Sequence, residues 1–320
     1  MATESLKIAL IYELREAYKA LGYSNADCDR FEVGEAAEHI AAALKNLGHE
    51  VVLVPDIHSL VKRLAHGEGS TWDLAFNTTE GLHGLAREGQ VPALLEAYQI
   101  PFTFSDAATM ALCLDKGRTK MVLEHFNVPT APFAVIHFDH TAEKTQVSLD
   151  EILSMIRMSR HSETLLSQYP LFVKPLAEGS SKGIGATNKI KSIESLCGVV
   201  NSLRDSSPSS LGSADDWAGE ADEIKIGRDD QEAGLACQTA LRAWTVLRCR
   251  DGGRIDIRMD HSSGSPVAHV MEIQINPLAG LLPHWSQLPM IAEHNNVSYN
   301  ELIEFILKSA LQRRRGRVLN

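Results

Sequence analysis

The 320-residue chain lacks several features, and each absence excludes a class of protein. No run of about 18 apolar residues occurs, so no membrane-spanning helix is expected. The first residues show no basic start followed by an apolar core, so no signal peptide is expected either. Basic residues are fewer than acidic ones, 31 against 41, and the net charge of −10 argues against nucleic acid as a partner. These absences predict a cytoplasmic protein without a nucleic-acid or membrane partner.

Cysteine is also scarce. The five cysteines are odd in number, scattered and without a C-x-x-C pair, which predicts reduced thiols in the cytosol. The rest of the composition, 44% apolar and 22% charged, is ordinary for a globular protein, and 320 residues correspond to about two domains. The one concentration of positive charge, at residues 313–317, is interpreted as a solvated tail.

Strands and helices alternate in the first third of the chain. Continuous apolar runs predict buried strands, and apolar residues at helical spacing predict the helices between them. The expected elements are strands at 7–12, 50–54 and 73–77, helices at 33–47 and 90–98, and an extended segment at 100–104. This alternation predicts a parallel sheet with helices packed on it.

The rest of the chain mixes helices with separate strand segments. The expected elements are helices at 110–126, 192–203, 232–247 and 299–311, a strand at 170–174, and a strand pair at 254–259 and 268–275. Residues 204–231 contain few large apolar side chains and many acids, serines and glycines. That composition predicts a loop or a weakly folded insert.

The strand pair holds the first group of polar side chains that could support chemistry. Charged residues alternate with isoleucines from Arg254 to Arg258, and oxygen-bearing side chains alternate with isoleucines from Glu272 to Asn276. One such strand alone would indicate a solvated sheet face. Two of them, with acid and amide oxygens, favour ligands for magnesium that bridges the phosphates of a nucleotide.

A second polar group follows the predicted strand at 170–174. Lys174 ends this strand, and residues 175–185 contain glycines, serines and a further lysine. Glycines let the backbone approach a phosphate, hydroxyl and N–H groups donate to it, and lysine neutralises its charge. The segment is neither a Walker A loop nor a G-x-G-x-x-G motif. Taken alone, it is equally compatible with an ordinary glycine-rich hairpin.

Several segments together show a family pattern. They are Phe76–Gly81 with Arg87–Gln90, Ile100–Asp106 with Leu114–Lys120, Asn127–Phe133, Tyr169–Ser181, Gly253–Asp256, Gln274–Gly280 and His284–Pro289. In composition and order they resemble the D-alanine–D-alanine ligases of the ATP-grasp superfamily, over most of the chain. Each segment is modest alone, but their common order makes a chance resemblance improbable.

The resemblance implies an ATP-grasp architecture that combines α/β and α+β elements. An N-terminal parallel-sheet domain at 1–108 would precede two α+β subdomains, at 109–205 and 206–320, that clasp ATP. The last of these would hold the metal and substrate site. The implied activity is ATP-dependent joining of two D-alanine molecules through an acyl phosphate. ATP and Mg²⁺ or Mn²⁺ would be the cofactors, D-amino acids the small-molecule substrates, and a homodimer the assembly.

The resemblance also implies roles for individual residues. The expected ATP contacts are Lys116, Lys174, Glu178, Gly179, Ser180 and Ser181. The expected catalytic groups are Arg254 and the Gly280 N–H as oxyanion donors, Ser181 in the closing loop, and Glu32. The expected substrate contacts are Glu32, Glu80 and Ser286. The expected metal ligands are Asp256, Gln274 and Asn276.

Two departures from the family pattern leave alternatives open. Gln274 stands where the family has a metal-bridging glutamate, so one compensating charge beside the triphosphate is missing. Glu272, about 6.6 Å back along the strand, could replace it only if the register shifts by two residues. Residues 185–229 are short and polar where the family has strands that hold adenine. The alternatives are a ligase-like binding protein with impaired or no activity, and a ligase for a different acid and amine.

Overall fold

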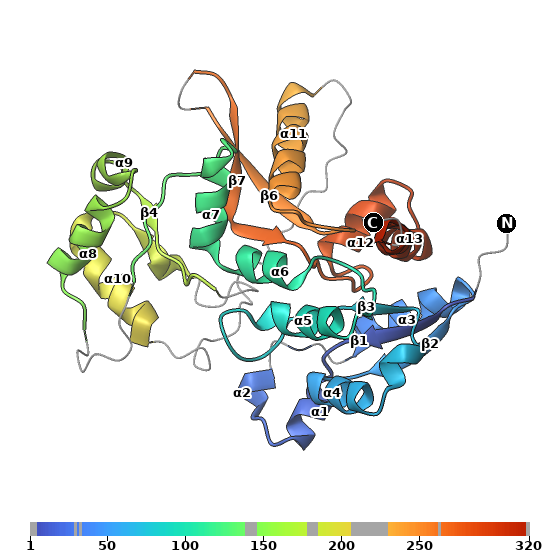
Figure 1. Cartoon of the computed structure of the whole chain (residues 1–320). Coiled ribbons are helices and arrows are strands. Elements are labelled where there is room, and N and C mark those ends of the chain that lie inside the picture. Colours follow the sequence, from blue (N-terminus) through green and yellow to red (C-terminus); the bar gives the residue numbers. More distant parts are fainter. Residues whose placement is uncertain are drawn as a thin grey trace.

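The architecture is described from a computed structural model of the whole chain (Figure 1). The described residues are 5–28, 31, 34–137, 146–177, 185–205, 230–261 and 264–317. Within these ranges no helix combines the length and the apolar character needed to cross a membrane.

A parallel three-stranded sheet organises the N-terminal part. Strand β1 (Lys7–Ile11) lies between β2 (Glu50–Val54) and β3 (Leu74–Asn77), and the strands run parallel, as the alternating sequence pattern predicts. Phe102 adds an isolated parallel bridge to Ala75, so the expected extended segment at 100–104 contributes one bridge rather than a strand. The surrounding helices are α1 (Arg15–Ala20), α2 (Asn25–Cys28), α3 (Glu35–Asn46), α4 (Ile57–Ala65) and α5 (Gln90–Ala97), with 3-10 turns at Glu68–Thr71 and Arg87–Gly89.

Successive residues of β1 face two different hydrophobic cores. Ile8 and Leu10 pack with α3 and with the C-terminal helix α13 (Tyr299–Arg317), whereas Ala9 and Ile11 pack with α4 and α5. Side chains alternate between the two faces of a strand, so helices on both sides keep β1 dry. The end of the chain therefore completes the N-terminal domain. The interpretation of residues 313–317 as a solvated tail is wrong for Arg313, which is half-buried at the end of α13.

The expected single helix at 110–126 is wrong, because two helices occupy this region. Helix α6 (Ala107–Leu114) ends before Asp115, and α7 (Lys116–His125) begins after it. Asp115 has an extended conformation, and its side chain accepts a hydrogen bond from the Arg118 N–H at 2.9 Å, which caps α7. The break places Lys116 at the first residue of a helix.

A small α+β unit follows, seen at the left of Figure 1. Strands β4 (Leu171–Phe172) and β5 (Lys189–Ile190) pair antiparallel, and α8 (Leu149–Arg157), α9 (Ser162–Ser167) and α10 (Ile193–Asp205) pack around their own core. The expected strand at 170–174 is thus only two residues long, and Phe172 is exposed.

The C-terminal part is built on an antiparallel hairpin. Helix α11 (Gln231–Val246) packs on β6 (Arg254–Asp260) and β7 (Val267–Asn276), and α6 and α7 contact β7 within the same hydrophobic core. Helix α12 (Gln287–His294) then leads to α13. The hairpin lies beside α7 and α11 in Figure 1, and its Asn276 end points toward α12 and the N-terminal sheet.

Candidate active site

Three of the expected polar residues lie together where β6 begins and β7 ends. Arg254 is directly opposite Asn276 in the antiparallel ladder, so their side chains share one sheet face. The Arg254 Nε donates to Asp256 Oδ1 at 2.9 Å, which brings the aspartate to the same group. All three residues are half-buried. The expected juxtaposition of Arg254, Asp256 and Asn276 is therefore present.

The hairpin register is irregular beside this group. Ile255 pairs with Ile275, but Ile257 pairs with Val270, so the register shifts at Asp256. The backbone of residues 271–274 belongs to β7, but their side chains lie outside the described part of the structure. The role of the Gln274 side chain as a ligand stays a prediction.

The loop after β7 brings Gly280 against Ser286. A Cβ at position 280 would lie 2.7 Å from the Ser286 hydroxyl oxygen, so only glycine fits this approach without a shift. The same hydroxyl accepts the Leu282 N–H at 3.0 Å, which fixes the turn that precedes α12. Two expected site residues from one loop are thus in direct contact.

The two expected phosphate-binding lysines lie close to a common segment. The Lys116 backbone N–H donates to the Leu176 carbonyl at 3.0 Å, and its Nζ is 3.4 Å from the same oxygen. Lys174 is two residues before Leu176, and its ammonium lies 5.2 Å from the centre of the Phe172 ring. Residues 178–184 follow directly and lie outside the described residues, with the predicted ATP contacts Glu178, Gly179, Ser180 and Ser181 among them.

An acidic group closes the carboxyl edge of the N-terminal sheet. Glu13 follows β1, and its carboxylate accepts the backbone N–H groups of Glu80 at 2.9 Å and Gly81 at 3.0 Å, and the Tyr18 hydroxyl at 3.0 Å. The pKa of Glu13 is raised to about 7, mainly by burial and also by the nearby Glu80 charge, and these effects outweigh the hydrogen bonds that lower it. Glu13 thus anchors the loop that contains the predicted substrate residue Glu80.

Arg87 and Glu88 connect this loop to the lysine segment. Arg87 is buried, and its Nη1 donates to the Ala177 carbonyl at 2.7 Å, immediately before residues 178–184. The pKa of Glu88 is raised to about 7, mainly by burial and also by the Glu80 charge, while the positive charges of Arg87 and Lys116 oppose the increase. Acids, an arginine and a lysine therefore act on one another electrostatically at one site.

Sequence reasoning located part of this acidic group. It selected Glu80 but not Glu13 or Glu88, and its Glu32 lies outside the described residues. A usable signal existed for Glu13, because it comes directly after a buried strand of a parallel sheet, where ligands characteristically bind.

The protein oxygen atoms at this site would suit a magnesium ion that takes its other ligands from a bound nucleotide. No group of three His, Cys, Asp or Glu side chains in the described ranges is arranged to hold a metal ion. Asp256 and Asn276 supply hard oxygen donors of the kind that Mg²⁺ prefers, and Mg²⁺ usually takes its remaining ligands from phosphates and water. These residues would hold the ion jointly with phosphate oxygens.

Comparison with known proteins identifies relatives in sequence and in fold. The family model described as D-ala D-ala ligase C-terminus matches residues 218–308. The D-alanine–D-alanine ligase of Marinobacter nauticus is 27% identical, over 92% of this chain and 93% of the relative. The corresponding enzyme of Burkholderia multivorans is 31% identical, over 74% and 79%.

Solved structures show the same fold. The D-alanine–D-alanine ligase from Bacillus anthracis complexed with ATP superposes with a TM-score of 0.64 at 16% identity, covering 98% of this chain and all of that one. The ligase from Coxiella burnetii gives a TM-score of 0.60 at 16% identity, covering 98% of this chain and 97% of the other. The expected ATP-grasp fold is therefore confirmed.

Proposed function

The chain belongs to the D-alanine–D-alanine ligase family of the ATP-grasp superfamily, and we propose that it joins two D-alanine molecules at the expense of ATP. One structural observation supports this proposal in addition to the family relation. Arg254, Asp256 and Asn276 lie together at the end of the hairpin, so the group that would face the reacting phosphate is assembled. Small-molecule substrates, a cytoplasmic location and a homodimer are part of the same proposal.

The proposed reaction has two steps. The carboxylate of the first D-alanine attacks the γ-phosphorus of ATP, which forms an acyl phosphate and releases ADP. The neutral amine of the second D-alanine then attacks the acyl carbon, and the tetrahedral intermediate collapses with loss of phosphate and a proton. Phosphoryl transfer depends mainly on positioning and on compensation of charge.

Lys116 and Lys174 are proposed to contact the phosphates. The link between Lys116 and Leu176 supports this role, because it holds both lysines beside the glycine- and serine-containing segment 178–184. Closure of this segment would exclude water, which hydrolyses acyl phosphates. The buried Arg87–Ala177 hydrogen bond supports the same role by fixing where the segment starts.

Arg254 and the Gly280 N–H are proposed to stabilise the oxyanion of the tetrahedral intermediate. Donors that are held in place before the reaction stabilise developing charge strongly. The pairing of Arg254 with Asn276, and the absence of room for a side chain at Gly280, support such a fixed geometry. Ser286, in contact with Gly280, is proposed to meet the carboxylate of the second substrate.

The acidic group is proposed to receive a substrate ammonium group. Glu80 and Glu88 lie in the loop that Glu13 anchors. Because burial raises the pKa of Glu88 to about 7, a further positive charge beside it would favour its ionised form. A bound ammonium would supply that charge. The position of Glu32, outside the described residues, leaves it as an additional predicted ligand.

Magnesium would compensate the charge of the phosphates, held by Asp256 and Asn276, with Gln274 as a neutral third donor. The missing carboxylate at Gln274 favours a second candidate function, a ligase-like protein that binds nucleotide but turns over slowly or not at all. The proposed domain limits are 1–108, 109–205 and 206–320. Helix α13 packs on the N-terminal domain, so the third segment would also contribute to that domain's core.

The decisive test begins with nucleotide binding, measured by calorimetry with and without magnesium. Lys174→Met retains most of the apolar stem and removes the charge, and it should weaken ATP binding about ten- to a hundredfold, as expected for a charge-assisted contact of about 1.5–3 kcal/mol. Lys189→Met, on the adjacent strand β5, is the matched control, since Lys189 is exposed. Equal ATP affinity in all three proteins would contradict the assignment of this segment to phosphate binding.

Phosphate release with D-alanine then separates the two candidate functions. Turnover that requires D-alanine supports the ligase, whereas ATP binding without turnover supports the binding protein.

A further inference from the structure

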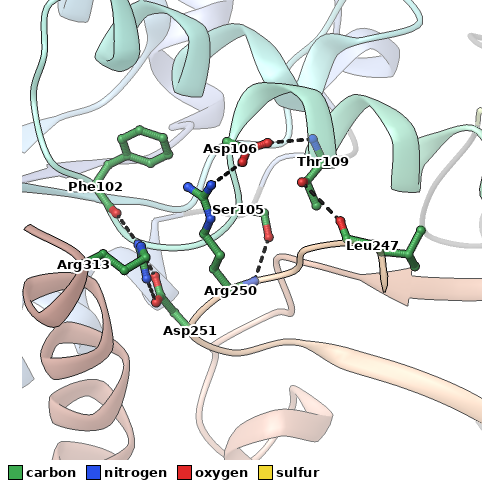
Figure 2. Close-up of polar contacts among 8 residues, drawn as sticks. All are labelled: Phe102, Ser105, Asp106, Thr109, Leu247, Arg250, Asp251 and Arg313. Atoms are coloured by element: carbon green, nitrogen blue, oxygen red, sulfur yellow. Dashed lines mark hydrogen bonds and ion pairs between the residues drawn. The ribbon is translucent and has the colours of Figure 1, made fainter. Parts of the chain in front are cut away.

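A network of polar contacts joins the N-terminal domain to the start of β6 (Figure 2). Three segments meet there: residues 102–106, residues 247–251 and the end of α13. Figure 2 shows the Arg313 guanidinium between the Phe102 carbonyl and the Asp251 carboxylate, while Arg250 reaches to Asp106 at the start of α6. None of these residues belongs to the proposed active site.

The Asp251 side chain is the centre of this network. Its carboxylate is fully buried, accepts the Phe104 N–H at 2.6 Å, and forms a two-pronged ion pair with Arg313. The same guanidinium donates to the Phe102 carbonyl at 2.9 Å. Asp251 also has a left-handed backbone conformation, with φ of 62°, which few non-glycine residues adopt. With these partners, the buried Asp251 carboxylate holds residues 247–251 in place against residues 102–106 and α13.

Arg250 makes a second connection to the same segment. Its backbone N–H donates to the Ser105 hydroxyl at 3.1 Å, and its guanidinium pairs with Asp106. Asp106 caps α6 by accepting the Thr109 N–H at 2.9 Å. The Thr109 hydroxyl in turn donates to the Leu247 carbonyl at 3.3 Å, which completes the connection. The first turn of α6 is therefore tied to residues 247–251.

The chain leads from this network to two residues with proposed functions, Lys116 and Arg254. Helix α6 leads to Lys116, about 12 Å further along its eight residues. In the other direction, Arg254 is the third residue after Asp251. Between Asp251 and Arg254, the backbone at Gly253 is packed so tightly that a side chain would not fit, since a Cβ there would lie 2.3 Å from the Asn276 carbonyl oxygen. A displacement of Asp251 would therefore be transmitted to Arg254.

We propose that Asp251 is a positioning residue, whose buried carboxylate holds Arg254 in register with the segment that leads through α6 to Lys116. This inference rests on the proposed function, in which Arg254 is an oxyanion donor and Lys116 a phosphate contact. Asp251 itself touches neither substrate. Its effect on the reaction would pass through Arg254, and a misplacement of about 1 Å in such a donor can lower turnover about a hundredfold.

Asp251→Gly is the primary variant, because glycine adopts the left-handed conformation freely and the change removes only the carboxylate. Asp251→Asn is the second variant, since it retains the size of the side chain and removes the charge. Both should lower kcat at least about tenfold, with the glycine variant more severe, while KM for ATP changes less than about threefold. Lys308→Met is the matched control on α13, where the exposed Lys308 pairs with the half-buried Glu304, and it should leave kcat unchanged.

A double-mutant cycle distinguishes positioning from general stability. In an Arg254→Lys background, Asp251→Gly should lower kcat less than about twofold further, because the residue through which it acts is already altered. An equal loss in both backgrounds, or a kcat unchanged by either Asp251 variant, would overturn the proposal.

Amide hydrogen exchange gives a second readout that does not depend on activity. Asp251→Gly should accelerate exchange at least about tenfold at residues 102–106 and 252–256, whereas Lys308→Met should not. Unchanged exchange in both segments would also overturn the proposal. A wild-type protein without D-alanine-dependent phosphate release would refute the proposed function instead, and exchange alone would then decide whether Asp251 couples the two segments.

Discussion

Replacement of Glu13 by glutamine should change how the stability of the protein depends on pH. Burial raises the pKa of Glu13 from 4.5 to about 7. The folded protein thus holds a proton on Glu13 between these two values, while the unfolded chain has already lost it. Since the unfolded state binds fewer protons in this window, the free energy of unfolding falls as pH rises from about 4.5 to about 7.

The magnitude follows from the size of the shift. The rise of the pKa from 4.5 to about 7 corresponds to about 3 kcal/mol in the free energy of unfolding, of which about 2–3 kcal/mol is lost between pH 5 and pH 8. Glu13→Gln removes the titrating group. The NH₂ group of the new glutamine side chain would face hydrogen-bond donors instead of accepting from them. This unmade hydrogen bond lowers the free energy of unfolding by about 1–3 kcal/mol at every pH. The variant should therefore be the less stable protein at pH 5 and should approach or exceed the wild type at pH 8.

Urea denaturation at pH 5, 6, 7 and 8 measures this difference. Glu301→Gln is the control: hydrogen bonds from Ser298 lower the pKa of Glu301, so its contribution changes only below pH 4.5, outside the measured range. If the Glu13→Gln and wild-type curves run parallel from pH 5 to pH 8, Glu13 is not a buried, protonatable carboxyl group, and the proposed electrostatics of the acidic site are wrong.

Further predictions concern the hairpin and the acidic site. Gly253→Ala should destabilise the protein by about 1–3 kcal/mol in thermal unfolding, because the new Cβ would lie 2.3 Å from the Asn276 carbonyl oxygen. Gly198→Ala is the control, since it lies in open space within α10 and should stabilise the protein by about 0.5–1 kcal/mol. Gln274→Glu should raise turnover at saturating ATP by restoring a charge beside the metal; no gain in steady-state assays would exclude this position as the defect. Binding of D-alanine at pH 6.5 should release protons from Glu88, because an ammonium group beside it would lower its pKa from about 7. Calorimetry in buffers of different ionisation enthalpy should detect these protons. A binding enthalpy that does not depend on the buffer would contradict this prediction.

The N-terminal sheet was predictable because one local pattern determines it. Residues 8–11 of β1 are uniformly apolar, since helices cover both faces of the strand, and β2 has the bounds expected from the sequence. The division of 110–126 was not predictable from hydrophobic spacing. Residues 115–120 contain no large apolar side chain, so this spacing does not locate the boundary, whereas the Asp115 side chain competes for a backbone N–H and starts a new helix there.

The site was predictable where neighbouring strands pair and not where distant segments meet. The alternation of polar side chains places Arg254 and Asp256 together, and strand pairing adds Asn276. The partner of Arg313 is 62 residues away in the sequence, so a run of arginines gave no sign that one of them pairs with the buried Asp251. Contacts of this kind depend on tertiary structure alone.

The most direct test of the central claim is the stoichiometry of the reaction of the unmodified protein with ATP, magnesium and D-alanine. Mass spectrometry would quantify the dipeptide, and enzymatic assays would quantify ADP and phosphate. We expect one D-alanyl-D-alanine for each ADP and each phosphate released, with no ADP formed when D-alanine is omitted. ATP binding without any dipeptide, or ADP release that does not depend on D-alanine, would contradict it.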